Sequence, residues 1–206
     1  MEFHKLIQTL EQKLANPLPG HQDLIERHGL PVRDINMPEK VHVKKSAVLL
    51  TLYPSKNGIY VPMILRPPYD GTHGGQMAFP GGRMEDKDES YERTALREAE
   101  EEVGLKALDV KIIGGLSSIY IAPSNYWVRP FVGVLDYTPT FFPDPREVAK
   151  IYEMNLEELL NPEAFAIKYQ EVRGHRIKTA GYQLQDQWVW GASALMIYEL
   201  LKVLND

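Results

Sequence analysis

The stretch that most constrains the fold covers residues 73–105, HGGQMAFPGGRMEDKDESYERTALREAEEEVGL. Its second half predicts one helix, because apolar residues recur there at helical spacing. Asp88 or Ser90 can cap the start of this helix, and Gly104 can end it. Ahead of the helix, residues 79–82 (Phe-Pro-Gly-Gly) predict the end of a strand and a loop whose backbone can approach a ligand closely.

One face of the predicted helix carries three carboxylates. Glu98, Glu101 and Glu102 are neighbours, since side chains three or four positions apart lie side by side on a helix. Such crowding destabilises an isolated helix by about 0.2–0.5 kcal/mol per pair, so the group calls for a counter-charge. Mg²⁺ or Mn²⁺, a hard divalent cation with oxygen ligands, supplies one. A solvated acidic face is the alternative, and the glycine turn and acidic loop before the helix favour the metal site.

Residues 97–105, Arg-Glu-Ala-Glu-Glu-Glu-Val-Gly-Leu, resemble the second half of the Nudix box at every fixed position. In the first half, the box glutamate falls on Glu89, but the box glycine falls on Arg83, and Gly82 comes one residue early. The loop therefore looks one residue longer than the standard pattern, with Asp88 as an alternative to Glu89. The resemblance implies a metal-dependent hydrolase of nucleoside diphosphate derivatives.

The expected chemistry follows from the carboxylates. A diphosphate linkage carries clustered negative charge and resists attack by water. Metal ions held by Glu98, Glu101 and Glu102 can neutralise that charge and lower the pKa of a bound water. The resemblance implies the carbonyl oxygen of Gly82 as an extra metal ligand.

Arg97 and a later glutamate complete the expected catalytic residues. Arg97 is expected to pair with Glu89 or Asp88 and to fix the helix to the loop, which is a structural role. The general base stays open between Glu98 and Glu147, because Nudix enzymes use a box glutamate or a glutamate from a later loop. For Glu147, a surface charge at the start of a strand is the alternative interpretation.

A more specific resemblance lies just ahead of the box. Residues 64–82 are similar to the motif that precedes the box in coenzyme A pyrophosphatases, and the likeness extends over residues 44–204. It implies that water cleaves coenzyme A or its thioesters to 3′,5′-ADP and 4′-phosphopantetheine. The substrate-binding residues that it implies are Arg66, His73, Gln76, Phe79 and Gly81. The family pattern has an arginine two residues before the histidine where this chain has Gly71, so we expect weaker discrimination for the 3′-phosphate.

Two other functions stay open. One is hydrolysis of ADP-ribose or another nucleotide sugar. The other is a nucleotide-binding regulator that has kept the fold and lost turnover. The intact Arg97-Glu98 and Glu101-Glu102 pairs favour an enzyme, since a binding protein has little need of three metal carboxylates. Substrate choice resides in loops whose geometry the sequence does not give.

The composition of the chain limits the binding partners and the cellular compartment that we expect. The chain has 206 residues, a net charge of −5 and no cysteine. The acidic balance gives no electrostatic footprint for nucleic acid or an anionic membrane, so the expected partner is a small-molecule nucleotide. The apolar run at residues 188–201 is interrupted by Glu199 and too short to span a bilayer. The lack of cysteine excludes disulfides and thiolate zinc sites and agrees with a cytoplasmic location.

The order of elements predicts the fold class. Residues 1–40 are expected to form an N-terminal helical extension, and residues 41–206 the Nudix hydrolase domain. The extension contains an amphipathic helix at residues 1–16 that packs on the core or on a second subunit, which leaves a homodimer open. Expected strands cover residues 44–53, 59–66, 110–120, 127–135, 148–154 and 175–184, with further helices at 156–160 and 192–204. This pattern predicts the α/β class in its α+β form, a Nudix-type α/β/α sandwich with a mixed sheet.

Overall fold

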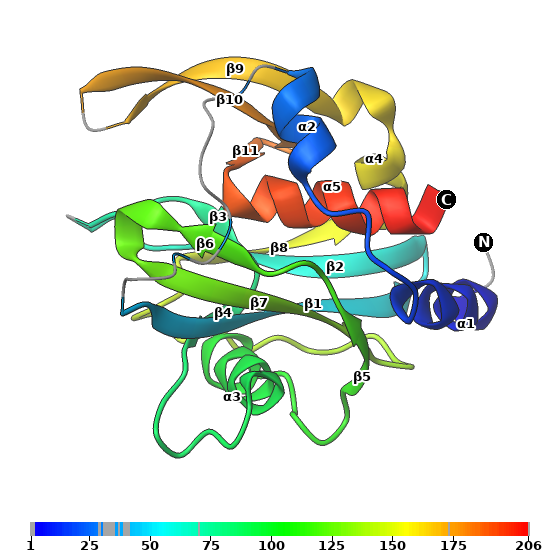
Figure 1. The fold of residues 1–206 in the computed structure, drawn as a ribbon. Coiled ribbons are helices and arrows are strands. Elements are labelled where there is room, and N and C mark those ends of the chain that lie inside the picture. Colours follow the sequence, from blue (N-terminus) through cyan, green and yellow to red (C-terminus); the bar gives the residue numbers. More distant parts are fainter. Residues whose placement is uncertain are drawn as a thin grey trace.

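The computed structural model describes residues 3–28, 30, 36, 38, 42–69, 71–172 and 174–205 (Figure 1). Its helices are α1 (Phe3–Leu14), α2 (Gln22–Arg27), α3 (Tyr91–Val103), α4 (Leu156–Leu160) and α5 (Ala192–Asn205). The first eight strands are β1 (Lys44–Ser55), β2 (Gly58–Leu65), β3 (Met77–Ala78), β4 (Gly81–Arg83), β5 (Lys111–Gly115), β6 (Ile119–Ile121), β7 (Tyr126–Val134) and β8 (Lys150–Asn155). The last three are β9 (Phe165–Val172), β10 (His175–Leu184) and β11 (Gln187–Trp190).

A mixed eight-stranded sheet forms the centre of the molecule. Strands run in the order β3-β2-β1-β7-β5, with β4 paired to β1, β6 to β7 and β8 to β2. β1 and β7 are parallel, whereas the other pairs in this sheet are antiparallel. β1 and β2 meet at a hairpin turn, where Ser55 pairs with Gly58. The mixed sheet and the α+β class therefore agree with the sequence prediction.

The central strand β1 separates two hydrophobic clusters, because successive side chains of a strand point to opposite faces of the sheet. Leu50 and Leu52 join the cluster that contains the apolar residues of α1 and α5. Leu49 and Tyr53 join the cluster on the other face, against α3. Figure 1 shows α3 on one side of the sheet and α5 on the other, which gives the predicted three layers.

The helix that carries the carboxylates begins and ends where local sequence signals predict. The Ser90 side chain accepts a hydrogen bond from the Arg93 amide at the N-cap. Gly104 ends the helix with φ 74°, a left-handed conformation that glycine adopts without strain. Asp88, the alternative N-cap, instead binds the side chain of Arg97.

The N-terminal helix is part of the core. Apolar residues of α1 belong to the cluster beneath α5: Leu6, Ile7, Leu10 and Leu14. Of the two predicted packing surfaces for this helix, the chain's own core is the one observed. The expected boundary between residues 40 and 41 lies outside the described residues, as do the first two residues of the predicted helix.

A buried ion pair fixes the segment before α2 to α5. His21 Nε2 lies 3.2 Å from Glu199 Oε2, and both side chains are buried. The Gly20 amide and the Ser117 hydroxyl donate to Glu199 Oε1 at 2.9 Å and 2.5 Å. Burial raises the pKa of Glu199, but the contacts with His21 and Ser117 outweigh it and hold that pKa below its ordinary value. Glu199, which interrupts the apolar run in the sequence, is thus a buried anchor.

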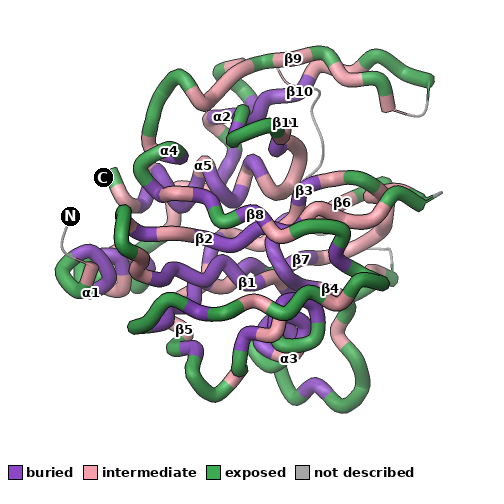
Figure 2. Tube along the Cα trace, turned by 180° about the vertical axis from the view of Figure 1, so that it is seen from behind, coloured by how far each residue is buried: buried purple, intermediate pink, exposed green. Residues whose placement is uncertain are grey.

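A second, three-stranded sheet has the order β11-β10-β9 and lies on the α5 side of the molecule (Figure 1). Only β10 was expected from the sequence. Figure 2 shows the tip of the β9–β10 hairpin projecting as an exposed arm. The predicted strand at residues 110–120 is two strands, β5 and β6, with an irregular register between Ile112 and Gly114. Among the described helices, none is long and apolar enough to cross a membrane.

Candidate active site

Three glutamates from two segments converge at the site. Glu98 and Glu102 lie one turn apart on α3, and Glu147 comes from the loop between β7 and β8. One carboxylate oxygen of each lies within 4.8 Å of the others. Glu98 and Glu102 are buried, whereas Glu147 is exposed. We call Glu98, Glu102 and Glu147 the glutamate cluster; all three are among the predicted catalytic residues.

Glu102 is the most enclosed member of the glutamate cluster, with 1% of its surface exposed. The Gly81 amide donates to Glu102 Oε2 at 2.7 Å, and Arg66 Nη2 lies 3.8 Å from Oε1. Oε1 is buried and has no hydrogen-bond partner. Burial raises the pKa of Glu102 to about 8, although Arg66 and the Gly81 amide oppose the shift. Oε1 accepts no hydrogen bond, so it is available to a bound cation that would favour the ionised carboxylate.

Glu98 packs directly against the backbone of Gly82. A Cβ atom at residue 82 would lie 2.5 Å from the Glu98 carboxylate, so a larger residue there would displace that carboxylate. Burial raises the pKa of Glu98, while Arg97 Nη1, 2.9 Å from Glu98 Oε1, lowers it. The Gly82 carbonyl accepts a hydrogen bond from the Ser46 hydroxyl at 2.6 Å, and Gly82 pairs with Ala47 of β1 in the sheet.

Arg97 fastens α3 to the acidic loop through Asp88. Arg97 Nε and Nη2 donate to the two oxygens of Asp88 at 2.9 Å and 2.8 Å. Thr94 and the Glu85 amide also donate to Asp88. The Arg97 guanidinium holds the pKa of Asp88 well below its ordinary value. Of the two partners left open by the sequence, Asp88 is the one used, and Glu89 is exposed.

We expect Arg97→Ala to lower the free energy of unfolding of the metal-free protein by about 2–4 kcal/mol at pH 7. The variant leaves the buried Asp88 carboxylate without its charged partner. Because the folded-state pKa of Asp88 is depressed, its contribution is present above the unfolded pKa, about 3.9, and is lost as the pH falls.

Denaturant unfolding at several pH values tests this expectation, with Arg93→Ala on the exposed face of α3 as the control. The gap between wild type and Arg97→Ala should be widest at pH 6–8 and shrink below pH 4. If Arg97→Ala lost no more stability than Arg93→Ala, the pairing of Arg97 with Asp88 would not stabilise the fold.

Glu101 lies outside the glutamate cluster. Its side chain is 53% exposed, and its oxygens face Arg97 Nη1 at 2.9 Å and Lys87 Nζ at 3.7 Å. Helix geometry explains this position, because residue 101 is rotated by about 100° from residue 102 around the axis. Of the three predicted metal carboxylates, the structure brings together Glu98 and Glu102 and adds Glu147.

The loop that supplies Glu147 is pinned to the end of α3. The amides of Phe142 and Asp144 donate to the carbonyls of Val103 and Glu102, both at 3.0 Å. This loop has no regular secondary structure, but its backbone is tied to the helix that carries the other two glutamates. No periodic pattern in the sequence signals these contacts, because they join loop amides to helix-end carbonyls.

A cleft of about 610 Å³ opens in front of the glutamates. Its lining includes the five predicted substrate-binding residues, Arg66, His73, Gln76, Phe79 and Gly81, together with Gly82, Arg97, Glu98, Glu101 and Glu147. Arg66 Nη2 donates to the Gly81 carbonyl at 3.2 Å, which places its guanidinium beside Glu102. Phe79 is almost wholly buried and also belongs to the core.

His73 connects two loops at the mouth of the cleft. Its ring nitrogens lie 3.2 Å from Gln76 Oε1 and 3.0 Å from Ser124 Oγ. Sequence reasoning did not single out Ser124 or Ser46, which both line the cleft. Each lies far along the chain from its partner, and serine alone carries no signal for such a role.

The donor set fits a divalent metal ion. The glutamate cluster offers carboxylate oxygens, and the Gly82 carbonyl, which the family resemblance implies as a ligand, is a further oxygen beside them. Oxygen donors of this kind suit Mg²⁺ or Mn²⁺, and Glu102 Oε1 accepts no hydrogen bond that would compete with a metal ion. The residues that would hold the ion are therefore Glu98, Glu102, Glu147 and Gly82.

Comparison with known proteins gives the family. A family model for the NUDIX domain matches residues 43–173, more than half of the chain. The chain belongs to the Nudix family. The "Uncharacterized Nudix hydrolase NudL" of Photorhabdus laumondii is 38% identical over 129 residues, covering 63% of this chain and 68% of that protein. The protein of the same name from Pectobacterium atrosepticum is 37% identical over 141 residues, covering 65% and 69%.

Solved Nudix structures also align with the chain. A MutT/nudix family protein from Enterococcus faecalis has a TM-score of 0.49 at 14% identity, covering 100% of this chain and 73% of that chain. The Nudix hydrolase RenU from M. smegmatis has a TM-score of 0.47 at 22% identity, covering 56% and 72%. With the domain match and the NudL relatives, the protein is a Nudix hydrolase of nucleotide derivatives.

Proposed function

We propose that this Nudix hydrolase holds Mg²⁺ or Mn²⁺ at the glutamate cluster and cleaves the diphosphate of coenzyme A or its thioesters. The products are 3′,5′-ADP and 4′-phosphopantetheine, which keeps its acyl group when the substrate is a thioester. The observation that carries the proposal is the convergence of Glu98, Glu102 and Glu147 within 4.8 Å, with Glu98 and Glu147 in the wall of the cleft. A bound divalent ion supplies charge neutralisation at the phosphate oxygens and lowers the pKa of a water.

We assign the other roles, phosphate binding, proton transfer and positioning, to side chains around the cleft. Arg66 presents a cation beside the glutamates and can bind a phosphate oxygen of the substrate. Glu147 is the exposed member of the cluster and can accept a proton from a water in the cleft. Glu98, the other candidate base, is held by Arg97. The proposal therefore makes Glu147 the general base and Arg97 a positioning residue.

Support for coenzyme A comes from the motif at residues 64–82. Its polar residues Arg66, His73 and Gln76 all line the cleft, as the resemblance to coenzyme A pyrophosphatases implies. The cleft volume of about 610 Å³ suits a nucleotide-sized ligand. ADP-ribose, the second candidate, has the same linkage and would also place its diphosphate at the glutamates.

A hydrolysis screen tests the substrate. Coenzyme A, ADP-ribose, NADH and nucleoside triphosphates are incubated with the protein and Mg²⁺ or Mn²⁺, and the products are identified by mass. We expect 3′,5′-ADP and 4′-phosphopantetheine from coenzyme A. Cleavage of ADP-ribose alone would assign the protein to nucleotide sugars. Binding without cleavage of any compound would favour a regulator.

We expect Gly71→Arg to raise the preference for coenzyme A over 3′-dephospho-coenzyme A roughly ten- to a hundredfold in kcat/KM. The reason is a new charge-assisted contact with the 3′-phosphate, where the family pattern has arginine. A side chain at residue 71 must also displace the Tyr69 ring, because a Cβ there would lie 2.3 Å from it. That ring is half exposed and can move.

Gly71→Ala is the matched control, because it displaces Tyr69 without adding charge. The ratio of the two kcat/KM values should rise in Gly71→Arg and stay unchanged in Gly71→Ala. Equal ratios in both variants would show that residue 71 does not contact the phosphate.

A further inference from the structure

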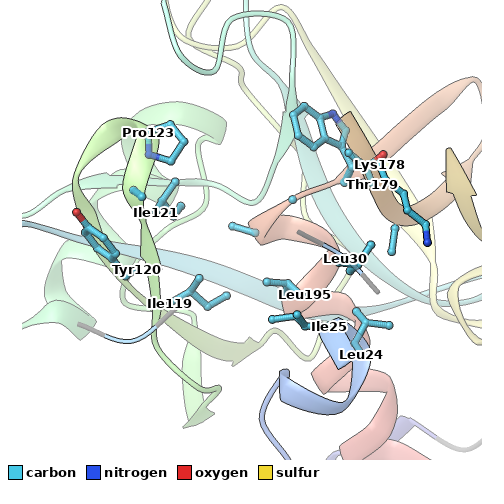
Figure 3. A pocket seen from close by; sticks show the side chains of 15 residues that line it. Leu24, Ile25, Leu30, Ile119, Tyr120, Ile121, Pro123, Lys178, Thr179 and Leu195 are labelled. Carbon is cyan, nitrogen blue, oxygen red and sulfur yellow. The ribbon is translucent and has the colours of Figure 1, made fainter. Parts of the chain in front are cut away.

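An apolar cavity lies beside the cleft, between β6, α2, β10 and the start of α5 (Figure 3). Its volume is about 80 Å³. Five residues line both the cavity and the cleft: Ile121, Pro123, Trp190, Gly191 and Ala192. The two spaces are therefore neighbours with a common wall. None of the three glutamates lines the cavity, so a group that enters it is not the reacting diphosphate.

Among the described residues, the cavity wall is mostly apolar, and three of its polar side chains bond elsewhere. Lys178 Nζ donates to the His28 carbonyl at 2.7 Å, and the Thr179 hydroxyl donates to the Lys168 carbonyl at 3.1 Å. The Tyr120 hydroxyl donates to Asn125 Oδ1 at 3.0 Å. Because most of the wall is apolar, a base, a ribose or a phosphate would replace few of its hydrogen bonds to water here. The wall suits an uncharged apolar group.

Part of the wall comes from outside the region that matches the NUDIX family model. Leu24 and Ile25 belong to α2, and Leu195 belongs to α5, whereas the match covers residues 43–173. Figure 3 shows Leu24, Ile25 and Leu195 together, facing Ile119 and Ile121 of β6 across the cavity. The buried His21–Glu199 pair holds the chain before α2 against α5. The cavity is thus built by segments added to the shared domain.

We propose that this cavity is a subsite of the cleft that binds the acyl group of a coenzyme A thioester. This inference rests on the proposed function. Its size limits the group. One water occupies about 30 Å³ in the liquid, so about 80 Å³ accepts a few methylene groups and excludes a second nucleoside. The preferred substrates are short-chain acyl thioesters, and free coenzyme A leaves the cavity empty.

A chain-length series tests the acyl subsite. We measure kcat/KM for coenzyme A and its acetyl, butyryl and octanoyl thioesters with Mg²⁺. Each buried methylene should raise kcat/KM roughly fourfold, so butyryl should exceed acetyl by about fifteenfold, with no further gain for octanoyl. Cleavage of all four at equal kcat/KM would overturn the subsite and leave the proposed function standing.

Two leucines of α5 provide a matched pair of variants. Leu195 lines the cavity and Leu204 does not, and both side chains are half-buried. Leu195→Ala enlarges the cavity and should raise the octanoyl-to-butyryl ratio of kcat/KM about tenfold or more. Leu204→Ala should leave that ratio at its wild-type value. Equal ratios in the two variants would place the acyl group elsewhere.

A binding measurement keeps the test independent of turnover. Trp190 lines the cavity, so 1-hexanol that enters it should change tryptophan emission saturably in the wild type and not in Trp190→Phe. If no coenzyme A compound is cleaved, the proposed substrate is wrong. The same titration in Leu195→Ala, whose residue lines the cavity and not the cleft, then decides whether the cavity binds the apolar group, because only binding there should change its affinity. The absence of a saturable change in the wild type would overturn the subsite.

Discussion

Replacing Glu98 or Glu102 with glutamine is expected to lower kcat about a hundred- to ten-thousandfold. Each substitution keeps the shape of the side chain and removes one negative charge from the glutamate cluster. Glu100→Gln is the matched control, since Glu100 lies on the same helix and is exposed. Steady-state rates of the three variants with Mg²⁺ give the comparison. Rates near the wild-type value in Glu98→Gln or Glu102→Gln would exclude that residue as a metal ligand.

Glu101→Gln separates the two interpretations of the acidic face. If Glu101 keeps its position beside Arg97 and Lys87, its loss should lower kcat far less than the loss of Glu98. An equal loss would show that Glu101 turns inward and ligates the metal, as the box pattern implies.

Stability measurements show whether these variants fail through chemistry or through folding. Burial raises the pKa of Glu102 from its ordinary 4.5 to about 8, so the folded state binds its proton more tightly than the unfolded state does. The metal-free wild type should therefore lose stability as the pH rises from about 4.5 to about 8. Glu102→Gln should lack this decline and be at least as stable at pH 8.

Removing divalent metal ions is expected to abolish turnover. The glutamate cluster brings three carboxylates together, and one of their buried oxygens, Glu102 Oε1, accepts no hydrogen bond, so oxygen donors are available to a divalent cation. Excess chelator should stop hydrolysis, and added Mg²⁺ or Mn²⁺ should restore it. Full turnover in excess chelator would contradict the proposed mechanism.

Thermal unfolding gives a second measure of the same site. At a metal concentration of 100 times Kd, binding adds about 2.7 kcal/mol, which raises the Tm of a domain this size by about 5–10 °C. Glu98→Gln should show a smaller shift, and Glu100→Gln the full one. Equal shifts in all three proteins would place the metal away from Glu98.

Local sequence signals predicted the helix of the site well. Its caps at Ser90 and Gly104 and its apolar spacing depend on neighbours within a few positions, and the structure has helix α3 where they indicate. The strands β1 and β2 were predicted for the same reason, since an Asn-Gly turn joins two apolar runs. The Arg97 pairing was narrowed to two candidates, and burial of Asp88 decided between them.

The features that could not be predicted from the sequence depend on contacts between residues far apart in the chain. Glu98, Glu101 and Glu102 look equivalent in the sequence pattern. In the structure, the loop after β7 brings Glu147 close to Glu98 and Glu102 but not into a cluster with Glu101. Glu199 appears as an interruption of an apolar run because its partner His21 is far away in the chain. The strand β9 alternates half-buried and exposed residues, and its weak apolar pattern resembles a polar loop.

The pinned loop after β7 has a consequence for how the protein opens. The amides of Phe142 and Asp144 are bonded to the last carbonyls of α3, so fraying of the helix end would release the loop as well. Glu102 and Glu147 would then leave the cleft together. In hydrogen-exchange terms, these two amides belong to the same cooperative unit as the end of α3. The site is expected to be complete or absent, with no half-assembled state between.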